Sequence, residues 1–304
     1  MSSKKGRAKK GGAGGKGDRH KKGSSGGFGD LSDGSIIYGA GEFDPVAQRD
    51  LLIETWHARN DLYKQMFGEP TQVYPPNYGP PAKLKEVKEI DPNTVNGGSG
   101  DPGDPQAEEQ HLAILAYGPD PLRPYWTYVT AGVCSPWVQH EPAEVSGFGC
   151  ELMIKSPVDE AWPAQILRSL AFHIFNHGGV ISPGVRIGLN APIKENSDSL
   201  LRNLFVWYAD EAPDGWYILP AGGFGIFCVV GITEDECRYA ESVDESGTWC
   251  IQEVLRYTGT GQVSIPERAS VINEENAERL NNARIFANNF NADIAAKNIR
   301  FEQE

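Results

Sequence analysis

The segment Phe224-Gly-Ile-Phe-Cys-Val-Val-Gly-Ile-Thr-Glu-Asp-Glu236 contains both kinds of secondary structure that decide the fold. Residues 224–232 are an apolar, β-branched and aromatic run, which predicts a strand. Thr233 and Glu236 then form the T-x-x-E pattern of a capping box, in which each residue satisfies a backbone N–H at a helix start. The segment therefore predicts a strand that passes directly into a helix.

Further strands are predicted on both sides of this segment. Apolar stretches bounded by Gly, Pro and Asp predict strands at 111–117, 125–134, 148–155, 185–189, 201–209 and 216–219. The last of these should form a hairpin with 224–232 around residues 220–223. A helix is predicted at 163–176, because Pro163 suits a first turn and Gly178 a helix end. Its buried face should carry Leu167, Leu170, Ala171 and Ile174.

Three more helices follow from spacing. The first, at 46–67, closes before Pro70, and a short one is predicted at 249–256. The last, within 274–297, is weakened by its many Asn residues. Strands and helices are mixed without strict alternation, so we expect one α+β domain with a mostly antiparallel mixed sheet packed against helices. The evidence for the first helix is a spacing of three and four among Leu52, Trp56, Arg59, Leu62 and Met66.

Composition divides the rest of the chain. Residues 1–34 are rich in Gly, Lys and Ser, and they offer too little apolar surface to offset ordering entropy, so we expect a disordered basic arm. Residues 68–110 hold eight Pro and six Gly and predict a long irregular connection rather than a core element. Residues 258–304 form a C-terminal extension with one predicted helix.

The charge is distributed unevenly. Residues 1–22 contain nine Lys or Arg and one Asp, a formal charge of +8, and the whole chain carries -13, so the remainder carries -21. The chain has five cysteines and no C-x-x-C pair, which argues against both a disulfide framework and a zinc ribbon. With no apolar run long enough to span a bilayer, we expect a soluble, cytoplasmic protein without membrane attachment.

Two combinations of residues could support catalysis. His173 and His177 share a helix face, but H-E-x-x-H would need Glu at position 174, which is Ile. Cys134 lies near His140, yet no nucleophile elbow is present. We therefore expect no catalytic residue, no metal site and no cofactor. A hydrolase using Cys134 or the His173/His177 pair stays open as an alternative.

Five segments, in order, carry a resemblance to one family. They are Arg123-Pro-Tyr-Trp-Thr-Tyr-Val-Thr-Ala-Gly-Val-Cys134, Ser146-Gly-Phe-Gly-Cys-Glu-Leu152, the Trp162-Pro163 helix with Leu167 and Ser169-Leu-Ala171, Gly225–Ile232 with Thr233–Glu236, and Glu253-Val-Leu-Arg256. They resemble the RPY, SGFG-x-EL, WP, TEEE-like and ELLR segments of Suppressor of fused proteins. Residues 111–257 then form a single Suppressor of fused-like core.

The resemblance implies binding rather than catalysis. Animal members hold a transcription factor inactive, and bacterial members are often linked to toxin systems as immunity proteins. Tyr128 falls where animal members place a Tyr near their bound peptide. Only about fifty residues follow Arg256, too few for the second domain with which those members clamp a ligand, so the clamp is not carried over.

The site expected for a partner is the sheet edge and the loop after residues 125–134. Tyr128, Trp137, His140 and Glu144 are the predicted contacts, since Pro136 and Pro142 stiffen this loop. The acidic body favours a basic protein partner, such as a toxin or a DNA-binding factor. A nucleic-acid-associated protein acting weakly through the basic arm is a further alternative.

Overall fold

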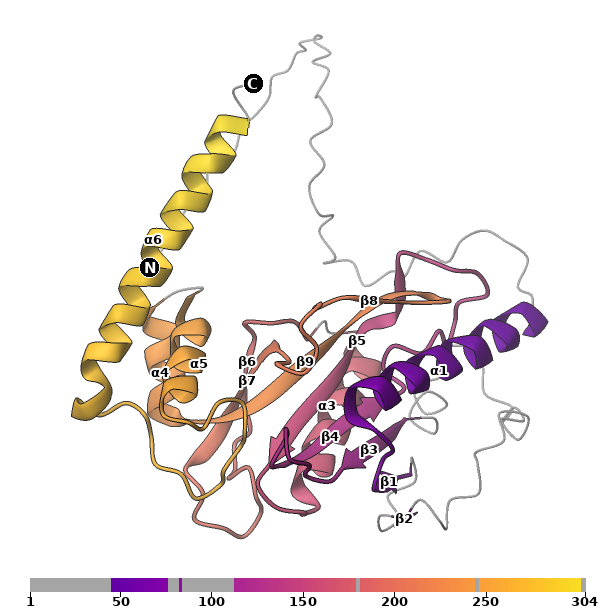
Figure 1. Cartoon of the computed structure of the whole chain (residues 1–304), viewed down its shortest axis with the longest axis horizontal. Coiled ribbons are helices and arrows are strands. Elements are labelled where there is room, and N and C mark those ends of the chain that lie inside the picture. Colours follow the sequence, from indigo (N-terminus) through magenta and orange to yellow (C-terminus); the bar gives the residue numbers. More distant parts are fainter. Residues whose placement is uncertain (1–44, 76–81, 84–111, 179–180, 244–245, 302–304) are drawn as a thin grey trace, which may run out of the picture. The chain divides into compact units, whose positions relative to one another are not determined.

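The computed structural model describes residues 45–75, 82–83, 112–178, 181–243 and 246–301, and its centre is one mixed β-sheet (Figure 1). The strands run in the order β2-β1-β3-β4-β5-β9-β7-β6, and β8 also pairs with β9. All pairings between these strands are antiparallel except that of β5 with β9. The strands are β1 (Gln72–Tyr74), β2 (Ala82–Lys83), β3 (Ala113–Tyr117), β4 (Trp126–Ala131), β5 (Val145–Ser156), β6 (Arg186–Gly188), β7 (Leu201–Tyr208), β8 (Tyr217–Leu219) and β9 (Gly222–Thr233).

Strand β9 shows why the sheet is covered on both faces. Its twelve residues are all buried. Ile226, Cys228 and Val230 belong to one apolar cluster, and Phe227 and Val229 belong to the other. Because side chains alternate across a strand, these two sets point to opposite faces. The continuous apolar run in the sequence is therefore a central strand between two layers.

Helices supply both layers. α3 (Trp162–His177) covers one face, where its apolar residues pack with Leu152 and Ile154 of β5. α1 (Pro45–Phe67), α4 (Glu234–Ser242) and α5 (Gly247–Tyr257) contribute to the cluster on the other face, with Leu280 from the start of α6 (Ala277–Phe301). A short 3-10 turn, Glu274–Asn276, precedes α6. The predicted α+β fold, with a mostly antiparallel mixed sheet packed against helices, is confirmed.

The predicted helix signals operate as expected in α3 and α4. Pro163 lies in the first turn of α3, and Gly178 ends that helix with a left-handed φ of 61°. In α4 the Thr233 hydroxyl accepts the Glu236 N–H, while the Glu236 carboxylate accepts the Thr233 N–H. The four residues expected on the inner face of α3 are all buried.

One expectation about the N-terminal half needs correction. Residues 68–110 are not irregular throughout, because β1 pairs with β3 and buries Val73 and Tyr74. In α1 the buried residues are Leu51, Thr55, Arg59, Tyr63 and Phe67, while Leu62 and Met66 pack partly buried against the same core. Thr55 and Arg59 are polar, so hydrophobic periodicity alone does not mark every buried position.

Some predictions lie outside the described residues. These are the disordered arm at 1–34 and the part of the connection at 84–110. Within the described ranges, no helix combines the length and apolar character needed to cross a membrane.

Candidate protein-binding site

A buried carboxylate fixes the start of the loop between β4 and β5. Glu151 is fully buried, and its Oε1 accepts the backbone N–H of Gly132 at 2.9 Å and of Cys134 at 3.1 Å. Its other oxygen accepts the hydroxyl of Thr130, and Arg59 of α1 lies 3.8 Å away. Hydrogen bonds to a charged acceptor are stronger than neutral ones. Glu151 thus joins β4, β5 and the loop in one network.

Two glycines allow this loop to lie against the start of β5. Gly147 has a φ of +53°, and a side chain there would overlap the carbonyl oxygen of Ser135 and come within 2.7 Å of the carbonyl carbon of Cys134. The Ser146 hydroxyl donates to the carbonyl of Cys134 at 2.6 Å. Gly149 also has a positive φ, of +70°, and the pairing of β5 with β9 shifts register here. The S-G-F-G pattern is therefore a strand irregularity that accommodates the loop.

The far end of the loop is held by the turn between β8 and β9. Ala143 N–H donates to the carbonyl of Ala221 at 2.9 Å, and Gly223 N–H donates to the carbonyl of Glu144 at 3.0 Å. The Gln139 side chain accepts the Gly147 N–H at 2.7 Å. Both ends of the loop are thus anchored to the sheet, while residues 141–145 are exposed.

Trp137, His140 and Glu144 all lie in this loop. Trp137 and His140 are half-buried and Glu144 is exposed. The Trp137 ring meets Trp56 of α1 edge-on, with 6.2 Å between centroids, and its Nε1 donates to the carbonyl of Gly132 at 2.9 Å. The loop therefore rests on α1 through Trp137 and presents Glu144 outward.

Tyr128 is not part of this exposed group. Its side chain is fully buried in the layer beneath α3, and its hydroxyl lies 3.1 Å from Asp159 Oδ1 and accepts the Glu160 N–H at 3.1 Å. It pairs with Ile154, nine positions along β5 from Val145. Desolvation raises the pKa of Tyr128 well above its ordinary value. We do not retain Tyr128 as a contact residue.

The residues considered for catalysis lie in unsuitable surroundings. Burial, reinforced by the negative charge of Glu151, raises the pKa of the Cys134 thiol, so this thiol stays protonated at neutral pH. His173 and His177 are exposed on α3 with ring centroids 4.7 Å apart. Within the described part of the chain, no third His, Cys, Asp or Glu completes a metal-binding group with them or elsewhere.

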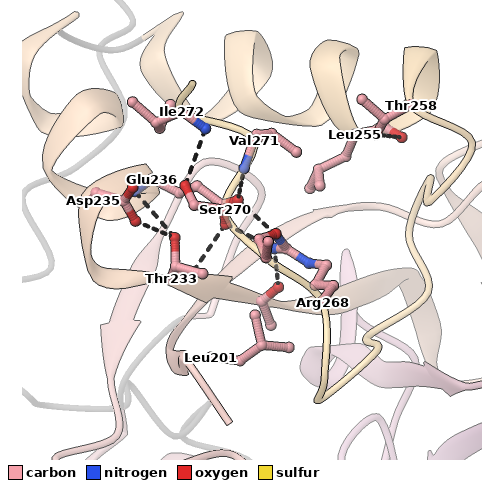
Figure 2. Close-up of polar contacts among 12 residues, drawn as sticks. Leu201, Thr233, Asp235, Glu236, Leu255, Thr258, Arg268, Ser270, Val271 and Ile272 are labelled. Atoms are coloured by element: carbon pink, nitrogen blue, oxygen red, sulfur yellow. Dashed lines mark hydrogen bonds and ion pairs between the residues drawn. The ribbon is translucent and has the colours of Figure 1, made fainter. Parts of the chain in front are cut away.

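A second buried carboxylate stabilises the C-terminal end of the domain. Figure 2 shows Arg268 directed at Glu236, with both carboxylate oxygens paired at 2.6 and 2.7 Å. Glu236 also accepts the Val271 N–H at 2.8 Å, and Arg268 donates to the carbonyl of Gly231 at 2.9 Å. This cluster ties the segment after α5 to the junction of β9 and α4. Both oxygens of Glu236 and both terminal nitrogens of Arg268 are used internally, so the cluster is structural.

Sequence reasoning missed the role of Glu151. The signal was a single acidic residue inside the apolar run Cys150-Glu-Leu-Met-Ile154, where an unpaired charge would be costly. It also did not single out the exposed apolar side chains of Trp216 and Ile218 beside Val145, which are 46%, 77% and 38% exposed.

The geometry defines a mixed-sheet α+β domain with one strongly anchored surface loop. The family model for the Suppressor of fused protein matches residues 108–268, more than half of the 304 residues. The chain therefore belongs to the Suppressor of fused family, which confirms the resemblance. Members of this family are protein-binding regulators.

Solved structures agree with this fold. The crystal structure of the Sufu–Fu complex is 20% identical with a TM-score of 0.54, covering 76% of this chain and 97% of that one. Drosophila Suppressor of Fused is 19% identical with a TM-score of 0.54, covering 77% of this chain and 54% of that one. This chain thus spans about half the length of the Drosophila protein. A search of curated proteins found no match.

Proposed function

We propose that this protein binds one protein partner and holds it inactive through the loop at 135–145. The observation that carries the proposal is the anchoring of this loop. Glu151 and the β8–β9 turn hold its two ends, while Glu144 is exposed at its outer side. A surface loop held by a rigid scaffold loses little entropy on binding, so it suits recognition.

The charge of the body favours a basic protein of the cytoplasm as the partner. Residues 23–304 carry a formal charge of -21, which speeds the approach of a basic partner. A nuclease toxin, neutralised in the manner of an immunity protein, and a sequestered DNA-binding factor both have this chemistry. The same charge opposes nucleic acid as the main ligand of the body. The buried, protonated Cys134 disfavours the hydrolase alternative.

Affinity capture with the immobilised full chain tests this function. We expect quantitative mass spectrometry to find one basic protein that is retained by wild type and reduced at least tenfold by Glu144→Lys. Glu195→Lys makes the same charge change at another exposed position and should retain the partner. A partner held equally by both variants would place the interface elsewhere. Failure to capture any specific protein from the native source would contradict the function.

The captured partner then allows calorimetry with Trp137→Ala and His140→Ala. If Trp137 is an interface anchor, its loss should cost about 2 kcal/mol or more of binding free energy. Because the ring also packs on Trp56, circular dichroism and urea unfolding must accompany each titration. Lost binding with an unchanged unfolding midpoint supports a contact role, and a lowered midpoint alone indicates a packing role.

A further inference from the structure

A group of exposed apolar side chains adjoins the end of the loop, where Val145 pairs with Gly223. Ile218 of β8 pairs with Gly223, so the two residues share the face toward α3. Trp216, Ile218 and Val145 are well exposed, and Tyr208 at the end of β7 is 51% exposed. We call these four residues the Trp216 surface.

Glycines form the floor of the Trp216 surface. A side chain on Gly223 would clash with the indole of Trp216, and one on Gly149 would come within 2.6 Å of Val145 Cγ1. Gly215 lies against the ring of Tyr208, since a side chain there would be 3.8 Å from Cδ1. The exposed rings thus rest on bare backbone rather than on mobile side chains. A surface ordered before binding loses little entropy when a ligand arrives.

The charge around this surface is one-sided. Residues 132–150 contain Glu141 and Glu144, residues 208–224 contain Asp210, Glu211 and Asp214, and neither segment contains Lys or Arg. Asp210 pairs with Arg256, and Glu211 pairs with Lys155 at 2.6 Å. The remaining acids, Glu141, Glu144 and Asp214, are exposed and form no ion pair within the described residues. An apolar, aromatic patch therefore has an unneutralised acidic rim.

Strand β8 adds an edge without a strand partner. Among the described strands it pairs only with β9, and the helix α1 also lies near it. Such an edge can receive an extended segment through main-chain hydrogen bonds, while neighbouring side chains select its sequence. Exposed Trp and Tyr rings attract Lys and Arg, and the acidic rim adds to that attraction.

We propose that the Trp216 surface binds an extended segment of the partner that carries both Lys or Arg and apolar side chains. This inference rests on the proposed function, because it assumes that the physiological ligand is a protein. Glu144 belongs to both regions, since it ends the anchored loop and its carbonyl accepts the Gly223 N–H. The loop and the Trp216 surface then form two adjacent parts of one interface. A second copy of this chain is disfavoured, because it would oppose acidic rim to acidic rim.

A random dodecapeptide library displayed on phage tests this chemistry with the full chain immobilised. We expect peptides that bind wild type to be enriched in Lys or Arg together with Leu, Ile or aromatic residues. The best synthetic peptide, measured by fluorescence anisotropy, should lose at least tenfold in affinity with Trp216→Ala and with Ile218→Asp. Leu122→Asp, at a residue 96% exposed elsewhere, is the matched control and should bind like wild type. Equal binding by all variants, or no enrichment of basic residues, would overturn the proposal.

The same variants, tested on the captured partner, separate this inference from the proposed function. A partner lost with Glu144→Lys but kept with Ile218→Asp leaves the function standing and refutes the Trp216 surface. The chain's own basic arm is the rival occupant. If replacing the nine Lys and Arg of residues 4–22 by Gln in the full chain strengthens peptide binding at least tenfold, the arm occupies the surface and a separate partner segment is refuted.

Discussion

Glu151 and Glu236 are buried carboxylates that hold the chain at two changes of direction. Glu151 accepts N–H groups from the loop after β4, and Glu236 accepts N–H groups at the start of α4 and from Val271. Both lie in segments that carry the family resemblance. These residues therefore preserve the fold, and the surface that contacts a partner must be sought among their exposed neighbours.

The pairing of Glu236 with Arg268 leads to a prediction about stability. The two side chains are 0% and 8% exposed, so removing Arg268 leaves a buried, unpaired carboxylate. Arg268→Met should lower the free energy of unfolding in urea by about 3–5 kcal/mol. Glu236→Leu combined with Arg268→Met should cost less than Arg268→Met alone, because no buried charge remains unpaired.

An exposed pair supplies the control. Arg238 and Glu234 are 72% and 55% exposed, and Arg238→Met should leave the urea midpoint almost unchanged. Equal effects of Arg238→Met and Arg268→Met would show that burial does not distinguish the two pairs, and the structural role given to Arg268 would be wrong.

The element that decides the shape of the proposed binding site is the irregular first half of β5. Residues 146–149 leave the regular pairing with β9, and Gly147 lets the preceding loop pass directly over the backbone. The position of Trp137 and Glu144 thus depends on Gly147, where the absence of a side chain leaves room for the loop backbone. A change at this glycine should act on the loop as a unit.

We therefore predict that Gly147→Ala destabilises the protein more than Gly178→Ala does. Both glycines have a left-handed φ, +53° and +61°, so each alanine should pay about 1–2 kcal/mol of backbone strain. Gly178 has open space around it, whereas a side chain on Gly147 would overlap Ser135. Urea unfolding of both variants measures the difference. Gly147→Ala should also weaken binding of the captured partner, and Gly178→Ala should leave that binding unchanged.

An equal loss of stability in the two alanine variants would mean that the loop moves aside without cost. Unchanged partner binding by Gly147→Ala would separate the loop's position from recognition, contrary to the proposed site.

At the scale of the whole molecule, charge divides the chain into a basic arm and an acidic body. Residues 1–22 carry +8 and the rest carries -21. The arm offers no apolar face for packing, and Coulomb attraction between exposed charges is strongly screened at physiological salt. Folding of the body should then be independent of the arm.

Removing the arm tests this independence. A chain that begins at Ser35 should melt within a few degrees of the full chain, because no core contact is lost. Circular dichroism melts at low and high salt measure the effect. If the chain that begins at Ser35 melts many degrees below the full chain, and this difference persists at high salt, the arm packs on the body.

Local sequence determined those parts of the fold whose signals are contained in a few neighbouring residues. Pro163 and Gly178 set the ends of α3, and Thr233 with Glu236 set the start of α4. Strand β9 was recognisable as a continuous apolar run. The loop containing Trp137, His140 and Glu144 was also predictable, because Pro and Gly mark its limits.

Only the tertiary structure decided features that depend on residues far apart in the chain. Strand β1 is stabilised by β3, about forty residues later, which overrides its Pro-rich setting. Thr55 and Arg59 are buried because α1 packs on the sheet, and Tyr128 is buried because α3 covers it. Trp216 and Val145 become neighbours only when β9 places their segments together. Propensity and periodicity act over a few residues, whereas burial and strand pairing are settled by contacts that form when the whole chain folds.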